Sequence, residues 1–409
     1  MEKSEFYKNA REEMTGPLHG VRVVEATTTW AGPMVGCMLA DHGATVIKVE
    51  HPAGEVIRRL PPMLPDSKLF VGNEMVNRNK QNVTIDLHKP EGVELFLKLT
   101  DSADIVVENF RPGTMDAWGV GYAAVSARNP KAVYVSVSGY GQFGPLSERV
   151  GYDPIAQFYS GWAAQNGERE GLPVKAGTFL CDDLAGVHGA LSALAALHHA
   201  KATGEGQHVD VALVDAIQFQ SDGYLTAGAL DMSINRWGSQ FEIAAPVNRY
   251  ACTDGYVYAG VLLDTHWQRL ADILERPDLK TDDRYATNLA RVQPDNREDV
   301  DRFVAEWCAE RTAGEVESIF EEAGLPATRV NTFAEAARLP HTRARDMLQD
   351  TVLSDGSTVP LVGPAAKFSR TPTKIRTPAP PLGKDTSDVL KEIGLSEPEI
   401  YALSERNVI

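Results

Sequence analysis

The first 215 residues alternate between short apolar runs and helical segments, and this alternation constrains the fold more than any other feature of the chain. The runs are nearly continuous in valine, isoleucine and leucine, which is typical of strands buried on both faces. Two of the helical segments between them open with a proline, Pro33 and Pro90. The expected strands cover 21–26, 45–50, 82–87, 104–108, 132–138 and a stretch within 203–216. The pattern predicts an α/β fold in which a doubly wound parallel sheet is covered by helices on both faces.

The character of the sequence changes near residue 225. A hairpin is expected around Asp254-Gly255, and charged helical segments follow it. From about residue 340 the chain is irregular and rich in proline, and it closes with two short helices. We predict a large α/β domain over 1–225, completed by the C-terminal segment 336–409, and a smaller α+β domain over 226–335.

Composition excludes several classes of protein. The 409 residues carry a formal net charge of -16, whereas a nucleic-acid-binding surface needs an excess of Lys and Arg. The first residues are polar, unlike a secretory signal, and we expect no run of about 18 apolar residues that would span a membrane. Four scattered cysteines are typical of reduced thiols. We therefore expect a cytoplasmic protein whose partners include neither a membrane nor a nucleic acid.

Several common catalytic motifs are incomplete or missing. Gly139, Gly141 and Gly144 form a G-x-G-x-x-G after a strand, but no amphipathic helix follows, so we interpret them as a loop near a ligand rather than a dinucleotide site. A hydrolase elbow, G-x-S-x-G, is not present. The histidines show neither H-E-x-x-H nor another ligand spacing, so the sequence predicts no metal site.

The segment "CDDLAGVHG" places Asp182 and Asp183 at the start of a long helix that carries no further charge until Lys201. On the pattern alone, helix capping is the favoured interpretation, since a carboxylate accepts backbone N–H bonds there. The other interpretation is a nucleophile, with small neighbouring residues that let a substrate approach. Cys181 and His188 are weaker candidates for catalysis. An apolar stripe along this helix is formed by Leu184, Val187, Leu191, Leu194 and Leu197.

Seven segments, in order along nearly the whole chain, resemble family III CoA-transferases, the group of formyl-CoA transferase and carnitine CoA-transferase, to which the 2-methylacyl-CoA racemases are related. The segments are 20–52, "NRNKQNVTIDL" (77–87), "VENFRPGTMDAWG" (107–119), "SGYGQFGP" (138–145), "CDDLAGVHGALSALAAL" (181–197), "TGEGQHVDVALVDA" (203–216) and "PPLGKDTSDVLKEIGLS" (380–396). The resemblance implies that Asp182, four residues before Gly186, is the nucleophile, and that Asp183 is its structural neighbour. The implied reaction moves CoA from an acyl-CoA to a small carboxylic acid through an aspartyl-CoA thioester.

The resemblance also implies the surroundings of the reaction. No cofactor would be bound permanently, because CoA thioesters are the substrates, and the protein would be an interlocked homodimer. Arg58 and Arg59 are further cations that could meet the CoA phosphates. The predicted contacts to CoA are Trp30, Ala31, His51, Arg78, Lys80, Asn109 and Tyr140.

The branch of the family is less constrained. The glycine-rich loop of formyl-CoA transferase has no counterpart between 225 and 262, which favours the carnitine-type branch over formate–oxalate exchange. Racemases carry a base histidine where this chain has Tyr152, and a phenol is a poor base at neutral pH. A racemase and a non-catalytic subunit that binds CoA esters remain as alternatives.

Overall fold

The structure, a computed structural model, describes residues 1–65 and 67–409 and divides into two compact units. Unit 1 consists of Met1–Trp162, Lys175–Ala229 and His341–Ile409, and unit 2 consists of Ala163–Val174 and Leu230–Pro340. The domain boundaries expected from the sequence lie after residues 225 and 335, a few residues from these, and the segment 163–174 was expected in the large domain.

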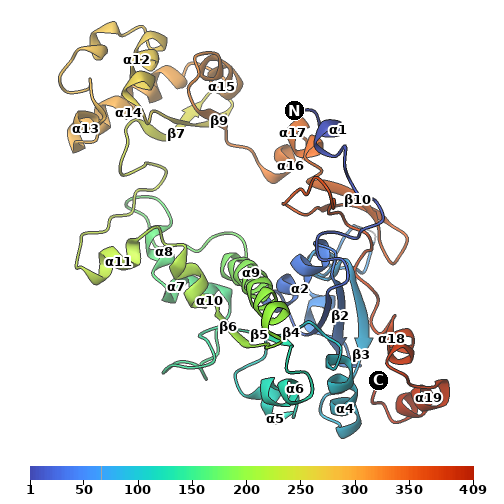
Figure 1. The fold of residues 1–409 in the computed structure, drawn as a ribbon. Coiled ribbons are helices and arrows are strands. Elements are labelled where there is room, and N and C mark those ends of the chain that lie inside the picture. Colours follow the sequence, from blue (N-terminus) through green and yellow to red (C-terminus); the bar gives the residue numbers. More distant parts are fainter. Residues whose placement is uncertain (66) are drawn as a thin grey trace. The chain divides into compact units, whose positions relative to one another are not determined.

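Unit 1 is built on a six-stranded parallel sheet with the strand order β3-β2-β1-β4-β5-β6 (Figure 1). Its strands are β1 (Arg22–Ala26), β2 (Thr45–Glu50), β3 (Lys80–Thr84), β4 (Ile105–Glu108), β5 (Val133–Ser138) and β6 (His208–Ala212). The predicted doubly wound α/β fold is therefore confirmed. The strand order reverses between β1 and β4, and ligands of such sheets bind beyond the carboxyl ends of the strands at this point.

Helices cover both faces of the sheet, and each face of the sheet has its own apolar core. The first face carries α2 (Ala31–Asp41), α7 (Asp153–Tyr159), α9 (Leu180–Thr203) and α10 (Leu213–Phe219). The second face carries α4 (Pro90–Thr100), α5 (Thr114–Ala117), α6 (Tyr122–Arg128), α18 (Thr386–Glu392) and α19 (Glu397–Glu405). The C-terminal helices thus complete the unit that the N-terminal half begins.

Helix α9 buries small residues that lie outside the predicted apolar stripe, and of the stripe itself it fully buries only Leu197. Ala185, Gly186 and Gly189 are buried, whereas Val187 and Leu191 of the predicted apolar stripe are exposed. The reason is the close approach of α2: a Cβ on Gly186 would lie 2.5 Å from Cγ of Met34. The prediction that these small residues clear space for a substrate is therefore wrong, because they admit a neighbouring helix.

The same helix is long and apolar enough to span a membrane by length and hydropathy alone, with a mean hydropathy of 1.3. This differs from the expectation that no such run is present. Its packing against α2, β5 and β6 accounts for the composition, since a central core helix meets apolar neighbours along its buried side.

Packing at Gly189 leads to a testable expectation. A Cβ at this position would lie 2.6 Å from Cγ2 of the fully buried Val35, whose β-branched side chain cannot yield by rotating freely. We expect Gly189→Val to lower the free energy of unfolding by about 1–3 kcal/mol, as overpacking does. Urea unfolding of this variant is compared with Ala195→Val at an exposed position of the same helix, which should change stability by less than about 0.5 kcal/mol. Equal losses in both variants would contradict the packing argument.

Unit 2 contains the predicted hairpin and a third strand. The strands β7 (Val247–Cys252) and β8 (Gly255–Gly260) pair antiparallel, and β9 (Ala327–Arg329) pairs with β8. The helical elements of this part are α12 (Asp264–Ile273), η2 (Pro277–Lys280), α13 (Asn288–Arg291), α14 (Pro294–Cys308), α15 (Ala313–Glu322) and α16 (Phe333–Ala336). The remaining elements of the chain are α1 (Lys3–Phe6), η1 (Val56–Arg59), α3 (Val71–Asn77), α8 (Trp162–Gln165), α11 (Tyr224–Ala229), α17 (Pro340–Ala344) and the hairpin of β10 (Leu348–Val352) and β11 (Thr358–Val362).

Candidate active site

The first turn of α9 is capped by a residue from another helix. Asp153, at the start of α7, accepts a 2.7 Å hydrogen bond through Oδ1 from the backbone N–H of Cys181. The residue at the N-cap of α9, Phe179, provides no side-chain cap. Asp182 and Asp183 lie in this turn without capping it. The capping interpretation is therefore wrong for both aspartates.

Asp153 belongs to a small clamp around the start of the helix. It is almost fully buried, and its Oδ2 accepts a 2.7 Å hydrogen bond from Nε2 of Gln157. Oε1 of Gln157 in turn accepts a 2.7 Å bond from the backbone N–H of Ala176. The clamp thus fixes both the first turn of α9 and the segment that leads into it.

The two neighbouring aspartates differ in their partners. Asp183 accepts a 2.7 Å hydrogen bond from Nε1 of Trp30, whose ring centre lies 5.0 Å from that of Phe179. None of the residues described in the structure donates a hydrogen bond to Asp182. Burial, with the negative charges of Asp153 and Asp183 added, raises the pKa of Asp182 to about 7. A carboxylate with few hydrogen-bond donors and poor solvation is more basic than usual and is free to attack an electrophile.

The loop after β1 holds Trp30 in place. Asn109 makes two hydrogen bonds of 2.8 Å to the backbone of Thr28, one to its N–H and one to its carbonyl. The N–H of Thr29 donates to Glu55, which also forms a 2.8 Å ion pair with the buried Lys48. Asn109 and Trp30 were each predicted to contact CoA, but the amide of Asn109 is engaged with the backbone of Thr28. It positions the loop that carries Trp30.

Two of the predicted CoA contacts lie in buried ion pairs. Arg78 binds Asp41 at 2.7 Å, and Lys80 binds Glu25 at 2.7 Å, with all four side chains nearly inaccessible to solvent. Nζ of Lys80 also donates to the carbonyl of Pro33 and to Asn77. These contacts speak against the prediction that Arg78 and Lys80 hold phosphates of CoA, because neither cation faces solvent. They also explain why β3 begins at Lys80, two residues before the predicted start.

The other two basic candidates, Arg58 and Arg59, differ in whether they have an ion-pair partner. Arg58 pairs with Glu50 at 2.7 Å, whereas Arg59 is exposed and has no ion-pair partner within 1–65 and 67–409. Of the four basic residues predicted to meet CoA phosphates, Arg58, Arg78 and Lys80 are paired with carboxylates, and Arg59 remains available to a phosphate.

Tyr140 follows β5 and packs beside α7. Its ring lies 5.3 Å from that of Tyr159 on α7, the helix that begins with Asp153. The buried hydroxyl of Tyr140 has no hydrogen-bond partner among the described residues, and a buried hydroxyl normally has one. It is thus a candidate to meet a ligand. Ala31, the remaining predicted contact in the loop after β1, is buried at the first position of α2.

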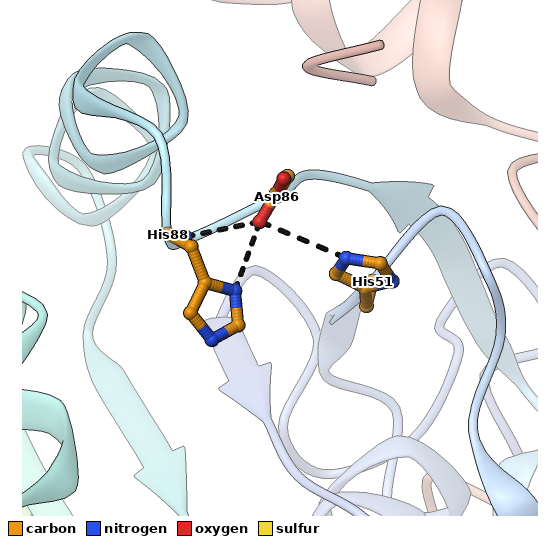
Figure 2. Close-up of side chains that lie close together, drawn as sticks. All are labelled: His51, Asp86 and His88. Carbon is orange, nitrogen blue, oxygen red and sulfur yellow. Dashed lines mark hydrogen bonds and ion pairs between the residues drawn. The ribbon is translucent and has the colours of Figure 1, made fainter.

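His51 lies elsewhere, beyond the end of β2. Figure 2 shows it beside Asp86 and His88, which follow β3, and together the three form a group of potential metal ligands. The sequence analysis predicted no metal site, because these residues are separated along the chain and show no ligand spacing. Sequence reasoning also missed Asp153 and Gln157, although Asp153 directly follows the Tyr152 that it considered.

Beside the loop after β1, the doubly wound sheet thus presents a carboxylate that receives no hydrogen bond from the described residues, an arrangement suited to covalent catalysis. Residues 18–386 match the family described as CoA-transferase family III. The chain is 35% identical to the succinyl-CoA–L-malate CoA-transferase beta subunit of Chloroflexus aurantiacus, over 97% of this chain and 98% of that protein. It is 34% identical to the succinate–glutarate CoA-transferase of Agrobacterium fabrum, over 92% and 96%. A crystal structure of a CAIB/BAIF family protein from Brucella suis superimposes with a TM-score of 0.83 at 32% identity, covering 93% of this chain and 100% of that chain.

This chain belongs to CoA-transferase family III and is an enzyme of that family. The resemblance stated from the seven sequence segments is confirmed.

Proposed function

We propose that this enzyme transfers CoA from succinyl-CoA to a second small carboxylic acid, with Asp182 as the nucleophile. The observation that carries the proposal is the carboxylate of Asp182, which is partly buried at the start of α9 and receives no hydrogen bond from residues 1–65 and 67–409. The names of the two enzymes compared above describe transfer among dicarboxylates, succinate with malate or glutarate. These relatives favour a dicarboxylate acceptor over the carnitine-type branch expected from the sequence.

The proposed reaction consists of four acyl transfers. An oxygen of Asp182 attacks the thioester carbonyl of succinyl-CoA, the C–S bond breaks, and a mixed anhydride forms with release of the CoA thiolate. The thiolate attacks the aspartyl carbonyl, which releases succinate and leaves an aspartyl-CoA thioester. The acceptor carboxylate then attacks this thioester, the C–S bond breaks, and a second mixed anhydride forms with release of the CoA thiolate. The thiolate finally attacks the acceptor's acyl carbon, which gives the acceptor's CoA thioester and releases the carboxylate of Asp182. Backbone N–H groups at the start of α9 are suited to stabilise the developing oxyanions.

The racemase alternative receives no support from the position of its base. Tyr152 stands where a racemase carries histidine, and its side chain is 65% exposed. A base for α-proton transfer has to act beside the substrate in a site that excludes water. We therefore keep covalent transfer as the proposed reaction.

The pH dependence follows from the raised pKa of Asp182. Only the ionised carboxylate attacks, so we expect the rate of the first acyl transfer to rise about tenfold per pH unit below about pH 7 and to level off above it. Asp153→Asn removes one of the two neighbouring charges and should move this midpoint to lower pH by part of the shift, since burial is the larger cause. Rapid-quench measurements with a single turnover would report the profile. A midpoint that stays fixed in Asp153→Asn would contradict the assigned electrostatic coupling.

We further propose a homodimer in the cytoplasm, with the large unit contributing an apolar face to the contact. Within unit 1, the helices α7, α9 and α10 pack together and expose Ile155, Phe158, Val187, Leu191 and Phe219. An exposed apolar patch of this kind is typical of a protein–protein contact.

We expect Leu191→Lys, after refolding from urea, to give less dimer and more monomer than the wild type in light scattering at micromolar concentration, because a charge is costly in an apolar contact. The matched control is Leu289→Lys, at an exposed position of unit 2, which should leave the mass unchanged. A wild-type monomer, or a Leu191→Lys dimer of unchanged affinity, would remove the support for this face.

Peptide mass spectrometry tests the proposed function directly. The wild type, Asp182→Ala and Asp183→Ala are incubated with succinyl-CoA, and separately with other acyl-CoAs, before digestion. We expect a hydroxylamine-sensitive CoA adduct on the peptide with Asp182, missing only from Asp182→Ala. The same adduct with another acyl-CoA but not with succinyl-CoA would retain the nucleophile and overturn the donor. No adduct with any thioester would overturn the covalent mechanism.

A further inference from the structure

We infer that His51, Asp86 and His88 form a binding site for a divalent transition-metal ion such as Zn²⁺, apart from the aspartates of α9. The three residues come from two neighbouring parallel strands. His51 directly follows β2, and Asp86 and His88 follow β3, while Glu50 at the end of β2 pairs in register with Thr84 at the end of β3. The carboxyl ends of the two strands therefore bring together residues that lie 35 positions apart in the sequence.

The geometry is that of a partly assembled ligand set (Figure 2). Oδ1 of Asp86 lies 3.0 Å from Nδ1 of His88 and 3.7 Å from Nε2 of His51. All three ligand atoms lie within 4.8 Å of one another. Ligands at about 2.0–2.2 Å from a tetrahedral Zn²⁺ are separated from each other by distances of this order, so a small closure of the two rings completes the set. Two imidazoles and one carboxylate suit Zn²⁺, and the fourth position remains open to water.

Neighbouring groups hold the ligands in place. The ring of His88 packs edge-on against Trp118, with 4.9 Å between the ring centres. Oδ1 of Asp86 also accepts the backbone N–H of His88 at 3.0 Å. These contacts restrict the side chains before an ion arrives, and such support raises metal affinity.

Two features oppose binding, and both are small. The ammonium of Lys89 lies 3.9 Å from Oδ2 of Asp86, but it donates to the carbonyls of Arg406 and Asn407 and leaves Oδ1 to the histidines. Nδ1 of His51 accepts the N–H of Ala53 at 3.0 Å, and this bond is lost when Nε2 binds a metal. Ala53 is exposed, so water replaces the lost acceptor.

The charge at the centre decides between a cation and an anion. The sequence resemblance implied that His51 contacts CoA, which would require an anion such as a phosphate at this position. The carboxylate of Asp86 lies within 3.7 Å of both rings, at the centre of the group. A carboxylate at the centre of the group repels phosphate and attracts a metal ion.

Calorimetric titration of the tag-free protein with ZnCl₂ tests the site. We expect one Zn²⁺ per chain, with affinity lowered by about tenfold or more in His51→Gln and in His88→Gln. His341→Gln, at an exposed position outside the group, should bind as the wild type does. Far-UV circular dichroism of each variant shows whether the fold is retained, and Asp86→Asn provides a third, nearly isosteric ligand change.

Bound Co²⁺ adds a second readout, since its visible absorption responds to nitrogen ligands. Loss of the histidine contribution in His88→Gln would support the site. No binding of Zn²⁺ at about 1 mM, or equal binding by the wild type and all three ligand variants, would overturn the inference.

Discussion

Asp182→Asn is expected to lower kcat/KM for CoA transfer by about 10⁴-fold or more, because the amide cannot form an anhydride with the acyl group. The replacement keeps the shape of the side chain and removes its charge. It therefore leaves intact the hydrogen bond that the backbone N–H of Cys181 donates to Asp153, which fixes this turn. Steady-state assays with succinyl-CoA and a panel of carboxylic acids give the ratio of kcat/KM between the wild type and Asp182→Asn.

Asp183→Asn is the matched control on the adjacent residue. Its side-chain oxygen still accepts the hydrogen bond from Nε1 of Trp30, so the loop after β1 keeps its anchor. We expect a much smaller loss than in Asp182→Asn, on the order of tenfold. Comparable losses in the two variants would contradict the assignment of Asp182 as the single nucleophile.

Lys80→Met is expected to lower the free energy of unfolding by about 3–5 kcal/mol, as removal of one partner from a buried ion pair does. Lys80 makes its 2.7 Å contact to Glu25 in the interior, where burial lowers the pKa of the lysine and Glu25 opposes this change. Without the lysine, the one described cation that still forms an ion pair with Glu25 is Lys48, at 3.7 Å. A buried carboxylate with a distant partner is costly because water cannot solvate it.

Two further variants separate this effect from the loss of a lysine in general. Lys201→Met removes an exposed lysine at the end of α9 and should change stability by less than about 0.5 kcal/mol. Glu25→Gln combined with Lys80→Met should recover part of the loss, since the uncompensated charge is gone. Urea unfolding followed by circular dichroism compares all of them. A loss below about 1 kcal/mol in Lys80→Met would mean that water reaches the pair.

The strands of the large sheet were predictable because each is a local apolar run. β1, β2, β4 and β5 lie within one residue of the expected ranges, since burial on both faces requires a continuous apolar sequence. β3 was placed two residues too late, because the charged Lys80 was left out of a strand that was expected to begin at Asn82. Both side chains face an interior that contains Glu25 and Glu50, so their burial depends on partners from other strands.

The candidate site was only partly accessible to sequence reasoning. Asp182 was identified through the resemblance to a family, and the pattern at the helix start by itself favoured capping. The residue that caps the helix, Asp153, lies 28 positions before Cys181, and no periodicity connects the two. The metal-ligand group of His51, Asp86 and His88 escaped notice for the same reason, since it forms only where two strands end side by side.

The sequence alone determined the fold class, the hairpin of the small unit and the family to which the chain belongs, because apolar periodicity, turn residues and motif order are local properties of the chain. Only the tertiary structure decided which face of α9 is buried. Val187 and Leu191 of the predicted stripe are exposed and Leu197 is buried, because the glycines allow α2 to approach so closely that small residues form much of the buried face. Tertiary structure also decided which charges are free. Arg78 and Lys80 look like ligand-binding cations in the sequence, and each is neutralised by a carboxylate that the fold places beside it.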